Sequence, residues 1–143
     1  MEKLSEHRLT RRVQFYETDA AGIVHFSNYL RYMEEAEHAL WRAAGLSIAP
    51  ADELNAKYGW PRVAVSCDFK KPLRFEDEFD ATIRIAAMSE KSIRYACELT
   101  VNPSGELVAT MSMTIVCVEK SPAPPYRPVP MPAVMRERFQ VSA

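Results

Sequence analysis

The stretch that decides the fold runs from Val13 to Gly45 and reads VQFYETDAAGIVHFSNYLRYMEEAEHALWRAAG. A short loop at residues 17–22 leads into residues 26–44, where apolar side chains recur at the spacing of an α-helix. This spacing predicts one long helix that buries a single face, made of Tyr29, Met33, Ala36, Leu40 and Ala44. Gly45 ends the helix because glycine readily adopts the left-handed conformation found after a helix C-terminus.

Strand patterns surround this helix on both sides. An imperfect alternation of apolar and polar residues predicts a strand over residues 8–16, and clearer alternation predicts four more after residue 61: 63–69, 79–87, 93–101 and 106–119. Turn-forming residues between these four strands indicate hairpin connections. The last strand is apolar on both faces, so we expect it to be central or covered by a second subunit. Residues 46–60 read as a connector with a short helical turn at 52–57.

The C-terminal part changes composition. Residues 121–132 are rich in proline and predict an extended arm that cannot continue a sheet, whereas residues 133–139 predict a short helix. The whole chain, residues 1–143, therefore reads as a single α+β domain with a sheet of about five antiparallel strands. Because one helix covers only one face of such a sheet, the other face argues for an oligomer.

Composition excludes several classes of function. A length of 143 residues suits one domain, and a net charge of −1 gives no electrostatic footprint for nucleic acid. The chain has neither an apolar run long enough to span a bilayer nor the apolar segment of a signal peptide, so we expect a cytoplasmic protein. Cys67, Cys97 and Cys117 lie far apart in strand-like runs, which indicates core positions.

The loop before the helix has a composition suited to chemistry. Asp19 lies just ahead of the predicted helix start, where free backbone N–H groups and the helix dipole stabilise negative charge. Such a site can hold an oxyanion while the carboxylate attacks a carbonyl carbon or activates water. The alternative is that Asp19 only caps a turn, since aspartate is common in loops that precede helices.

These residues also form a known pattern. The spacing D-x-x-G-I-V-x-x-x-x-Y, formed by Asp19, Gly22, Ile23, Val24 and Tyr29, resembles the signature of hot-dog-fold acyl-CoA thioesterases. The chain is most similar to the 4-hydroxybenzoyl-CoA thioesterase family, in the bacterial branch associated with the Tol-Pal operon. The later stretches FKKPLRFEDEF and RPVPMPAVMRERF also resemble this family, so the resemblance covers nearly the whole chain.

The resemblance implies a fold and an activity. In the hot-dog fold a curved antiparallel sheet wraps one long central helix, and two protomers join their sheets edge to edge with active sites at the interface. The implied reaction is hydrolysis of an acyl-CoA to free acid and CoA. Asp19 falls at the position of the catalytic acid, the backbone N–H of Phe26 at that of the oxyanion donor, and Gly22 keeps the loop tight. Whether Asp19 is the nucleophile or a general base stays open, as does pairing of dimers into tetramers.

Further residues are candidates for substrate binding. His25 precedes the implied oxyanion donor and could contact substrate or carry a proton, and Tyr29 faces the pocket or the core. Basic side chains are expected near the CoA phosphates, and Lys70, Lys71 and Arg74 cluster at a strand end. No cofactor is expected, because CoA is part of the substrate. The spacing of the three histidines supports no metal site: His7, His25 and His38.

Other interpretations compete with the loop acid. Glu17 could be a second acid, although a glutamate at a strand end is usually solvated. A related thioesterase branch has its catalytic glutamate on the central helix, but Glu34, Glu35 and Glu37 are expected here to form a polar or interface face. A hot-dog hydratase or dehydratase would need a paired histidine and acid, and its motif is absent. A non-catalytic acyl-CoA binder is the remaining alternative. The acyl group, the pathway and the thiol carrier, CoA or acyl carrier protein, stay open.

Overall fold

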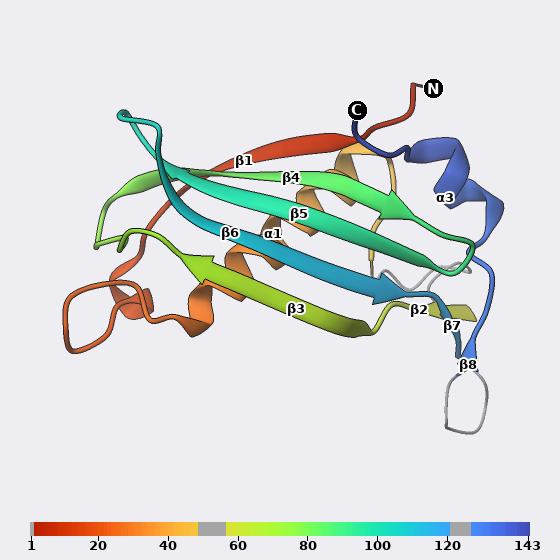
Figure 1. Ribbon diagram of the computed structural model, residues 1–143, viewed down its shortest axis with the longest axis horizontal. Helices are drawn as coiled ribbons and strands as arrows, with labels where there is room; N and C mark the ends of the chain where they lie inside the picture. Colours follow the sequence, from red (N-terminus) through yellow and green to blue (C-terminus); the bar gives the residue numbers. More distant parts are fainter. Residues whose placement is uncertain (1, 49–56, 121–126) are drawn as a thin grey trace.

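The computed structural model describes residues 2–48, 57–120 and 127–143. Its main feature is an antiparallel sheet of five strands, in the order β1-β4-β5-β6-β3, with the long helix α1 (Ser27–Ala43) along one face (Figure 1). The strands are β1 (Glu6–Arg12), β3 (Arg62–Phe69), β4 (Glu78–Met88), β5 (Ser92–Val101) and β6 (Glu106–Val116). The predicted α+β architecture and the long helix are confirmed.

The core lies between α1 and the sheet, because the two periodicities agree there. The predicted helix face is buried, and so are eight alternating residues of β4 and β5: Phe79, Ala81, Ile83, Ile85, Ile93, Tyr95, Cys97 and Leu99. Trp41 of α1 donates a hydrogen bond from Nε1 to the hydroxyl of Tyr95 at 2.9 Å. This buried contact ties the helix to the centre of the sheet.

The strand connections differ from the prediction in one place. Hairpins join β4 to β5 and β5 to β6, as expected. However, β3 pairs with β6 at the edge of the sheet, and residues 70–77 cross to β4 on the other side. The predicted hairpin between β3 and β4 is wrong because a hairpin requires neighbouring strands, and β1 and β5 occupy both sides of β4.

The sheet face away from α1 is mostly polar, so the argument that it needs a second subunit as cover does not hold. Its residues on β4, β5 and β6 include Asp80, Thr82, Arg84, Glu98, Thr100, Thr110, Ser112 and Thr114. Strand β6 is central, between β5 and β3, which explains its apolar composition. Exposed apolar residues lie instead on the edge strand β3, where Val63 is 58% and Val65 45% exposed.

The first strand is shorter than predicted. It ends at Arg12, and the chain then forms a short 3-10 helix, η1 (Phe15–Glu17). The carboxylate of Glu17 accepts a hydrogen bond from the N–H of Gln14 at 2.8 Å, and the N–H of Glu17 donates to the carbonyl of Gln14 at 3.0 Å. These local bonds turn the chain away from the sheet and toward the loop that carries Asp19.

A small second sheet, in the order β2-β7-β8, was not predicted. It joins β2 (Tyr58–Gly59), β7 (Val118–Glu119) and β8 (Arg127–Pro128). The prediction that the proline-rich arm cannot join a sheet is therefore wrong for β8, since an edge strand tolerates a residue without an N–H. Residues 121–126 of the arm and most of the predicted turn at 52–57 lie outside the described residues. Helix α3 (Ala133–Arg138) confirms the predicted C-terminal helix.

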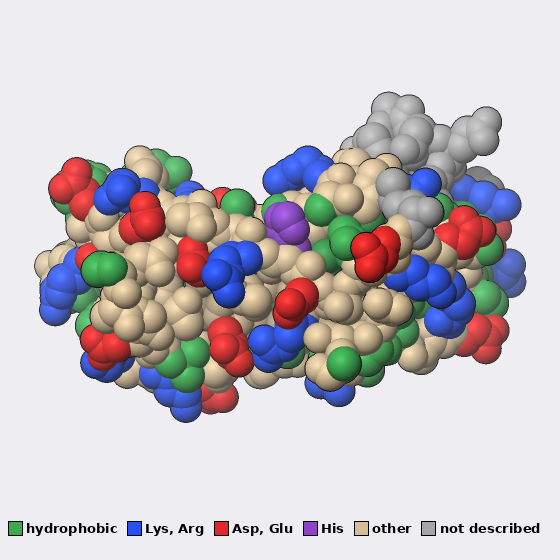
Figure 2. All heavy atoms as spheres, turned by 90° about the horizontal axis from the view of Figure 1, so that it is seen from above, with side chains coloured by type: hydrophobic (Ala, Val, Ile, Leu, Met, Phe, Trp, Pro, Cys, Tyr) green, Lys and Arg blue, Asp and Glu red, His purple; other side chains and the backbone are tan. Residues whose placement is uncertain are grey.

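Neither sign of charge dominates the face of the molecule seen in Figure 2. Figure 2 shows Lys and Arg side chains interspersed with Asp and Glu over one face of the molecule. Within the part of the chain that the structure describes, no helix is both long enough and apolar enough to cross a membrane. Cys97 and Cys117 are buried as predicted, and Cys67 is half-buried; all three are free thiols.

Candidate active site

The loop between η1 and α1 folds back on itself like a small hairpin. Thr18 bridges Val24 in antiparallel fashion, and the N–H of Asp19 donates to the carbonyl of Ile23 at 2.8 Å. Gly22 lies at the tight end of this turn with a φ of 81°, a conformation that L side chains rarely adopt. The Gly22 requirement is thus conformational, and the turn returns the chain from Asp19 to the start of the helix.

The start of α1 presents an unused backbone donor. Phe26 is the N-cap residue, and its N–H donates no hydrogen bond to any described residue. The preceding residue, His25, caps the next two donors: its Nδ1 accepts from the N–H of Ser27 at 3.3 Å, and its carbonyl accepts from the N–H of Asn28 at 2.9 Å. An unused N–H at a helix N-terminus is suited to bind an oxyanion.

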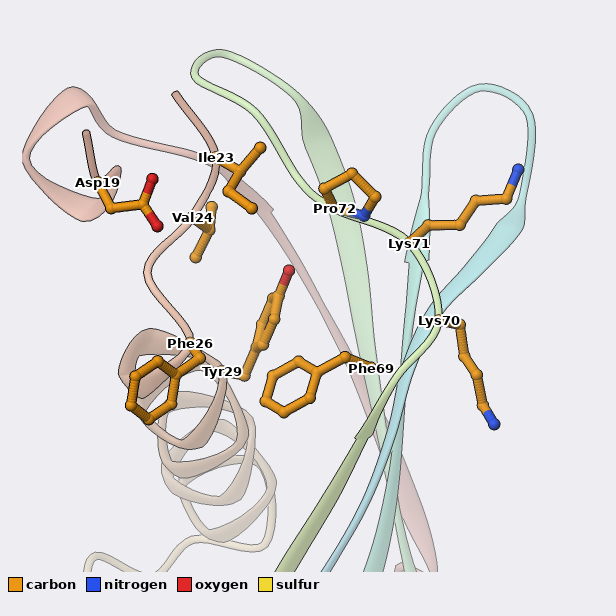
Figure 3. A pocket seen from close by; sticks show the side chains of 9 residues that line it. All are labelled: Asp19, Ile23, Val24, Phe26, Tyr29, Phe69, Lys70, Lys71 and Pro72. Carbon is orange, nitrogen blue, oxygen red and sulfur yellow. The ribbon is translucent and has the colours of Figure 1, made fainter. Parts of the chain in front are cut away.

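A pocket of about 490 Å³ opens beside this helix end. It brings together the loop, the first turn of α1 and the end of β3 (Figure 3). Its lining residues are Asp19, Ile23, Val24, Phe26, Tyr29, Phe69, Lys70, Lys71 and Pro72. The acid predicted from the sequence and the helix end that bears the unused donor therefore line one cavity. The predicted candidates Gly22, His25 and Arg74 do not line it.

The carboxylate of Asp19 has one oxygen engaged and one available. Oδ1 accepts a hydrogen bond from the N–H of Ala21 at 2.8 Å, while Oδ2 has no hydrogen-bond partner among the described residues. The first contact holds the side chain in one orientation, and the second oxygen faces no competitor. This arrangement suits an attack on carbon or the removal of a proton from water.

Aromatic rings form much of the cavity wall. The ring of Tyr29 packs on Phe69 with centroids 4.9 Å apart, which joins α1 to β3 across the cavity. Burial raises the pKa of Tyr29, so its hydroxyl stays protonated near neutral pH. Phe26 and Phe69 remain about half exposed or more, and both rings are accessible to a ligand. The site is apolar apart from Asp19, the hydroxyl of Tyr29, the backbone and the two lysines.

The three predicted basic residues differ in their surroundings. Lys71 forms an ion pair with Glu106 of β6, whereas Lys70 has no ion-pair partner among the described residues. Both side chains extend from the rim and away from the aromatic wall (Figure 3). Arg74 lies farther along the crossing segment, where it bridges Ile23 through the backbone. Lys70 is therefore the best placed of the three for a charged group at the pocket mouth.

Glu17 is buried, not solvated as expected. Its carboxylate pairs with Arg11 at 2.7 Å, and Arg11 also contacts Glu35 at 2.8 Å. Burial would raise the pKa of Glu17, but the hydrogen bonds from Arg11 and from the N–H of Gln14 outweigh it and hold the pKa below its ordinary value. Glu17 thus anchors the loop to β1 and does not line the cavity.

The helix glutamates also differ from the expected polar face. Glu34 is exposed and Glu35 partly exposed, but Glu37 is completely buried and paired with Arg62 of β3. Burial raises the pKa of Glu37, and the charge of Arg62 only partly offsets this effect. None of the three lines the cavity that contains Asp19. Glu37 thus links α1 to β3 inside the protein, through its ion pair with Arg62.

Two residues in or near the cavity were not among the candidates from the sequence. Phe69 is the last residue of the predicted strand 63–69, directly before the candidates Lys70 and Lys71, and this position could have suggested a place in the pocket wall. Asn28, which is 7% exposed, was not a candidate, and no local pattern marks it.

The buried cysteines are not ionised at neutral pH. Burial raises the pKa of Cys97 to about 12 and of Cys117 to about 11, so both thiols stay protonated.

Metal ligands do not gather in the part of the chain that the structure describes. Across residues 2–48, 57–120 and 127–143, no three His, Cys, Asp or Glu side chains come together in a group that could hold a metal ion.

Comparisons with known proteins identify the family of this chain. The family model of the thioesterase-like superfamily matches residues 13–139. A 1,4-dihydroxy-2-naphthoyl-CoA hydrolase of Synechococcus elongatus is 24% identical over 140 residues, which cover 98% of this chain and 99% of the relative. The solved structure of a gentisyl-coenzyme A thioesterase is 30% identical, with a TM-score of 0.77 over 91% of this chain and 99% of that one.

A third comparison shows the fold alone. A mutant 4-hydroxybenzoyl-CoA thioesterase, solved in complex with 4-hydroxybenzoyl-CoA, is 20% identical with a TM-score of 0.80, over 94% of this chain and 98% of that one. These comparisons show the hot-dog fold, but they do not distinguish the 4-hydroxybenzoyl-CoA branch from other branches of the superfamily. The chain belongs to the thioesterase-like superfamily and is a thioester hydrolase with the hot-dog fold.

Proposed function

We propose that this protein hydrolyses an acyl-CoA thioester to a free acid and CoA, with the carboxylate of Asp19 as nucleophile or general base. The observation that carries the proposal is that Asp19, whose carboxylate has an open oxygen, and Phe26, whose N–H is unused, line one largely apolar cavity. A thioester carbonyl in this cavity would accept a hydrogen bond from Phe26, which stabilises the oxyanion as it forms. Water is the only other reactant, and the proposed chemistry needs no cofactor.

Two routes lead from this geometry to the products. In the first, Asp19 attacks the carbonyl carbon, the C–S bond breaks, CoA leaves as a thiolate that takes up a proton, and water then hydrolyses the resulting anhydride. In the second, Asp19 takes a proton from a water molecule that attacks the same carbon. The C–S bond of the tetrahedral intermediate then breaks, and CoA leaves as a thiolate that takes up the proton from Asp19. Both routes place the developing negative charge on the carbonyl oxygen, next to the Phe26 N–H.

We further propose an aryl acyl group as the preferred substrate. Phe26, Tyr29 and Phe69 offer ring faces and edges, which favour stacked or edge-to-face contacts with an aromatic acid. Two relatives support this choice by their names, a 1,4-dihydroxy-2-naphthoyl-CoA hydrolase and a gentisyl-coenzyme A thioesterase. We also propose that the chain belongs to the 4-hydroxybenzoyl-CoA branch associated with the Tol-Pal operon. A panel that includes short aliphatic acyl-CoAs tests the preference for an aryl acyl group.

We also propose a homodimer formed through β3. This strand ends the sheet, and its backbone edge and exposed Val63 and Val65 are available for pairing with a second copy. Phe69 on the same strand lines the cavity, so the partner would lie close to the site. Light scattering of Val65→Lys against the wild type tests this: a dimeric wild type and a monomeric variant are expected. A wild type that is monomeric at micromolar concentration would contradict the dimer.

The principal experiment measures thiol release from a panel of acyl-CoAs with the wild type and Asp19→Asn. The variant is expected to lose about 10²- to 10⁴-fold in kcat, because asparagine is neither a nucleophile nor a base. Binding of a non-hydrolysable acyl-CoA analogue should persist. The matched control is Asp77→Asn, since Asp77 also accepts a backbone N–H in a turn, that of Arg74 at 2.9 Å, but does not line the cavity.

The outcomes separate the alternatives. If Asp19→Asn keeps wild-type turnover, Asp19 is not the catalytic residue. If the wild type binds acyl-CoAs but hydrolyses none, the protein is a binder and the proposed function is wrong. If only acyl carrier protein thioesters are hydrolysed, the thiol carrier is wrong and the chemistry is right.

A further inference from the structure

Asn28 contacts both ends of the segment that contains the catalytic loop. Its side chain is buried in the first turn of α1, and Nδ2 donates a hydrogen bond to the carbonyl of Glu17 at 2.8 Å. Its backbone N–H donates to the carbonyl of His25 at 2.9 Å. Glu17 lies two residues before Asp19, and His25 lies one residue before Phe26. One residue thus touches the backbone next to both proposed catalytic groups.

The bond to His25 matters because of peptide geometry. The carbonyl of His25 and the N–H of Phe26 belong to the same planar trans peptide, so they point in opposite directions. When the Asn28 N–H holds the carbonyl of His25 toward the helix, the N–H of Phe26 points out of the N-terminal end of the helix. The direction of the oxyanion donor is therefore set by the conformation of the first helical turn.

The side-chain bond sets where that turn lies relative to Asp19. The carbonyl of Glu17 accepts two donors, Nδ2 of Asn28 at 2.8 Å and the N–H of His25 at 2.9 Å. The second is a backbone bond that every variant at position 28 retains. The first exists only if residue 28 carries a donor of the right length. A buried amide also needs this partner, because leaving it without one is unfavourable.

We infer that Asn28 is a positioning residue, which holds the oxyanion donor of Phe26 in register with the carboxylate of Asp19. It acts through Glu17 and His25, does not line the cavity and contacts no substrate. This inference rests on the proposed function and adds a residue to it. Its loss should lower kcat, because a displacement of about 1 Å in an active site can cost about 100-fold. It should leave KM within about threefold, since the wall and the rim lysines are unchanged.

The test uses two variants in the full-length protein, Asn28→Ala and Asn28→Asp. An ionised aspartate lacks a donor and repels the carbonyl of Glu17, whereas a protonated aspartate regains an O–H donor. We expect kcat to fall about 10- to 100-fold in both variants at pH 8. As the pH is lowered toward 5, kcat of Asn28→Asp relative to the wild type should recover, while that of Asn28→Ala should stay low. A general loss of packing would not produce this difference.

The matched control is Asn102→Ala. Asn102 is a partly exposed amide whose Nδ2 donates to Glu78 and Asp80 at the turn after β5, outside the cavity. Its variant should keep kcat even if its melting temperature falls as much as that of Asn28→Ala. Amide NMR provides a readout besides activity: the Phe26 and Asp19 signals should shift in Asn28→Ala and not in Asn102→Ala.

The results are distinguishable from failure of the proposed function. If the wild type hydrolyses acyl-CoAs and both folded Asn28 variants keep kcat within twofold, Asn28 does not position the donor. Unshifted Phe26 and Asp19 amides in Asn28→Ala would overturn the inference in the same way. If the wild type hydrolyses nothing, the proposed function fails by itself, and the NMR comparison still decides whether Asn28 holds the loop and the helix end together.

Discussion

Replacement of Gly22 by alanine tests whether the shape of the loop is needed for catalysis. The φ of Gly22 is 81°, and a Cβ built at this position meets no heavy atom within 4 Å. Alanine would therefore clash with nothing, and its cost comes from the backbone conformation only. For a non-glycine residue in the left-handed region this cost is about 1–2 kcal/mol.

Gly105 provides a control with the same backbone requirement. Its φ is 76°, and an added Cβ again meets nothing within 4 Å. Each glycine donates its N–H across a turn, to Asp19 at 3.0 Å for Gly22 and to Val101 at 2.7 Å for Gly105. Gly105→Ala should therefore lose a similar amount of stability, but in the turn between β5 and β6 and outside the cavity.

The two variants should separate stability from activity. For a chain of this size a loss of about 1–2 kcal/mol lowers the melting temperature by roughly 2–8 °C, which calorimetry resolves. If the Gly22 loop relieves its strain by shifting, Asp19 moves with it, and a shift of about 1 Å can reduce kcat about 100-fold. Thiol release at saturating acyl-CoA should therefore fall in Gly22→Ala and stay at the wild-type level in Gly105→Ala.

Two results would refute this reasoning. Equal activity of the two variants, at equal loss of melting temperature, would mean that the loop tolerates the strain without moving Asp19. A much larger destabilisation of Gly22→Ala than of Gly105→Ala would mean that the space beside Gly22 is filled, contrary to the structure.

Three other perturbations have defined outcomes. Because the folded-state pKa of Glu17 lies below its ordinary value, its ion pair stabilises the fold above about pH 4.5 and this contribution is lost as the pH falls through the folded-state pKa. Glu17→Gln should therefore cost about 1–3 kcal/mol at pH 7, and its melting temperature should approach that of the wild type as the pH falls below the folded-state pKa of Glu17. Burial raises the pKa of Glu37, so its charge is unfavourable at neutral pH and proton uptake favours the folded state as the pH falls. Glu37→Gln should keep kcat within threefold, and a collapse of kcat would instead make Glu37 catalytic. Lys70→Ala should raise KM for acyl-CoA about two- to fivefold, and more than Lys71→Ala, whose lysine is already paired with Glu106. Both effects should vanish with an acyl-thioester substrate that lacks phosphates, and an equal effect on that substrate would contradict a phosphate contact.

Much of this molecule could be predicted from local patterns. The burial of Ile83, Ile85 and Leu99 follows from a period of two, and that of Met33 and Leu40 from a period near 3.6. Both periods depend only on backbone geometry, so they are visible in sequence order. The turn glycine and the acid at Asp19 were visible for the same reason, since eight positions of sequence contain the whole loop from Asp19 to Phe26.

The rest depended on which segments become neighbours. Alternation predicts β3 but not that it pairs with β6 at the sheet edge, because hydrogen-bonded backbone edges are alike in every strand. From the sequence, Glu17 is expected to be solvated and Glu37 to lie on a polar or interface face. In the structure both are buried and paired with an arginine of a strand, Arg11 of β1 and Arg62 of β3. Glu37 and Arg62 are 25 residues apart, and Arg11 lies on a strand while Glu17 lies on the short 3-10 helix that follows it, so neither pair leaves a local pattern in the sequence.

The site has the same division. The chain order alone determined the reactive loop, the helix that follows it and the face that the helix buries. Only the tertiary structure decided that Phe69 packs on Tyr29, that Lys71 is occupied by Glu106, and that Asn28 reaches the carbonyl of Glu17. The physical reason is that backbone periodicity and turn conformation act within a few residues, whereas a cavity is formed by side chains that meet only after the sheet has closed over the helix.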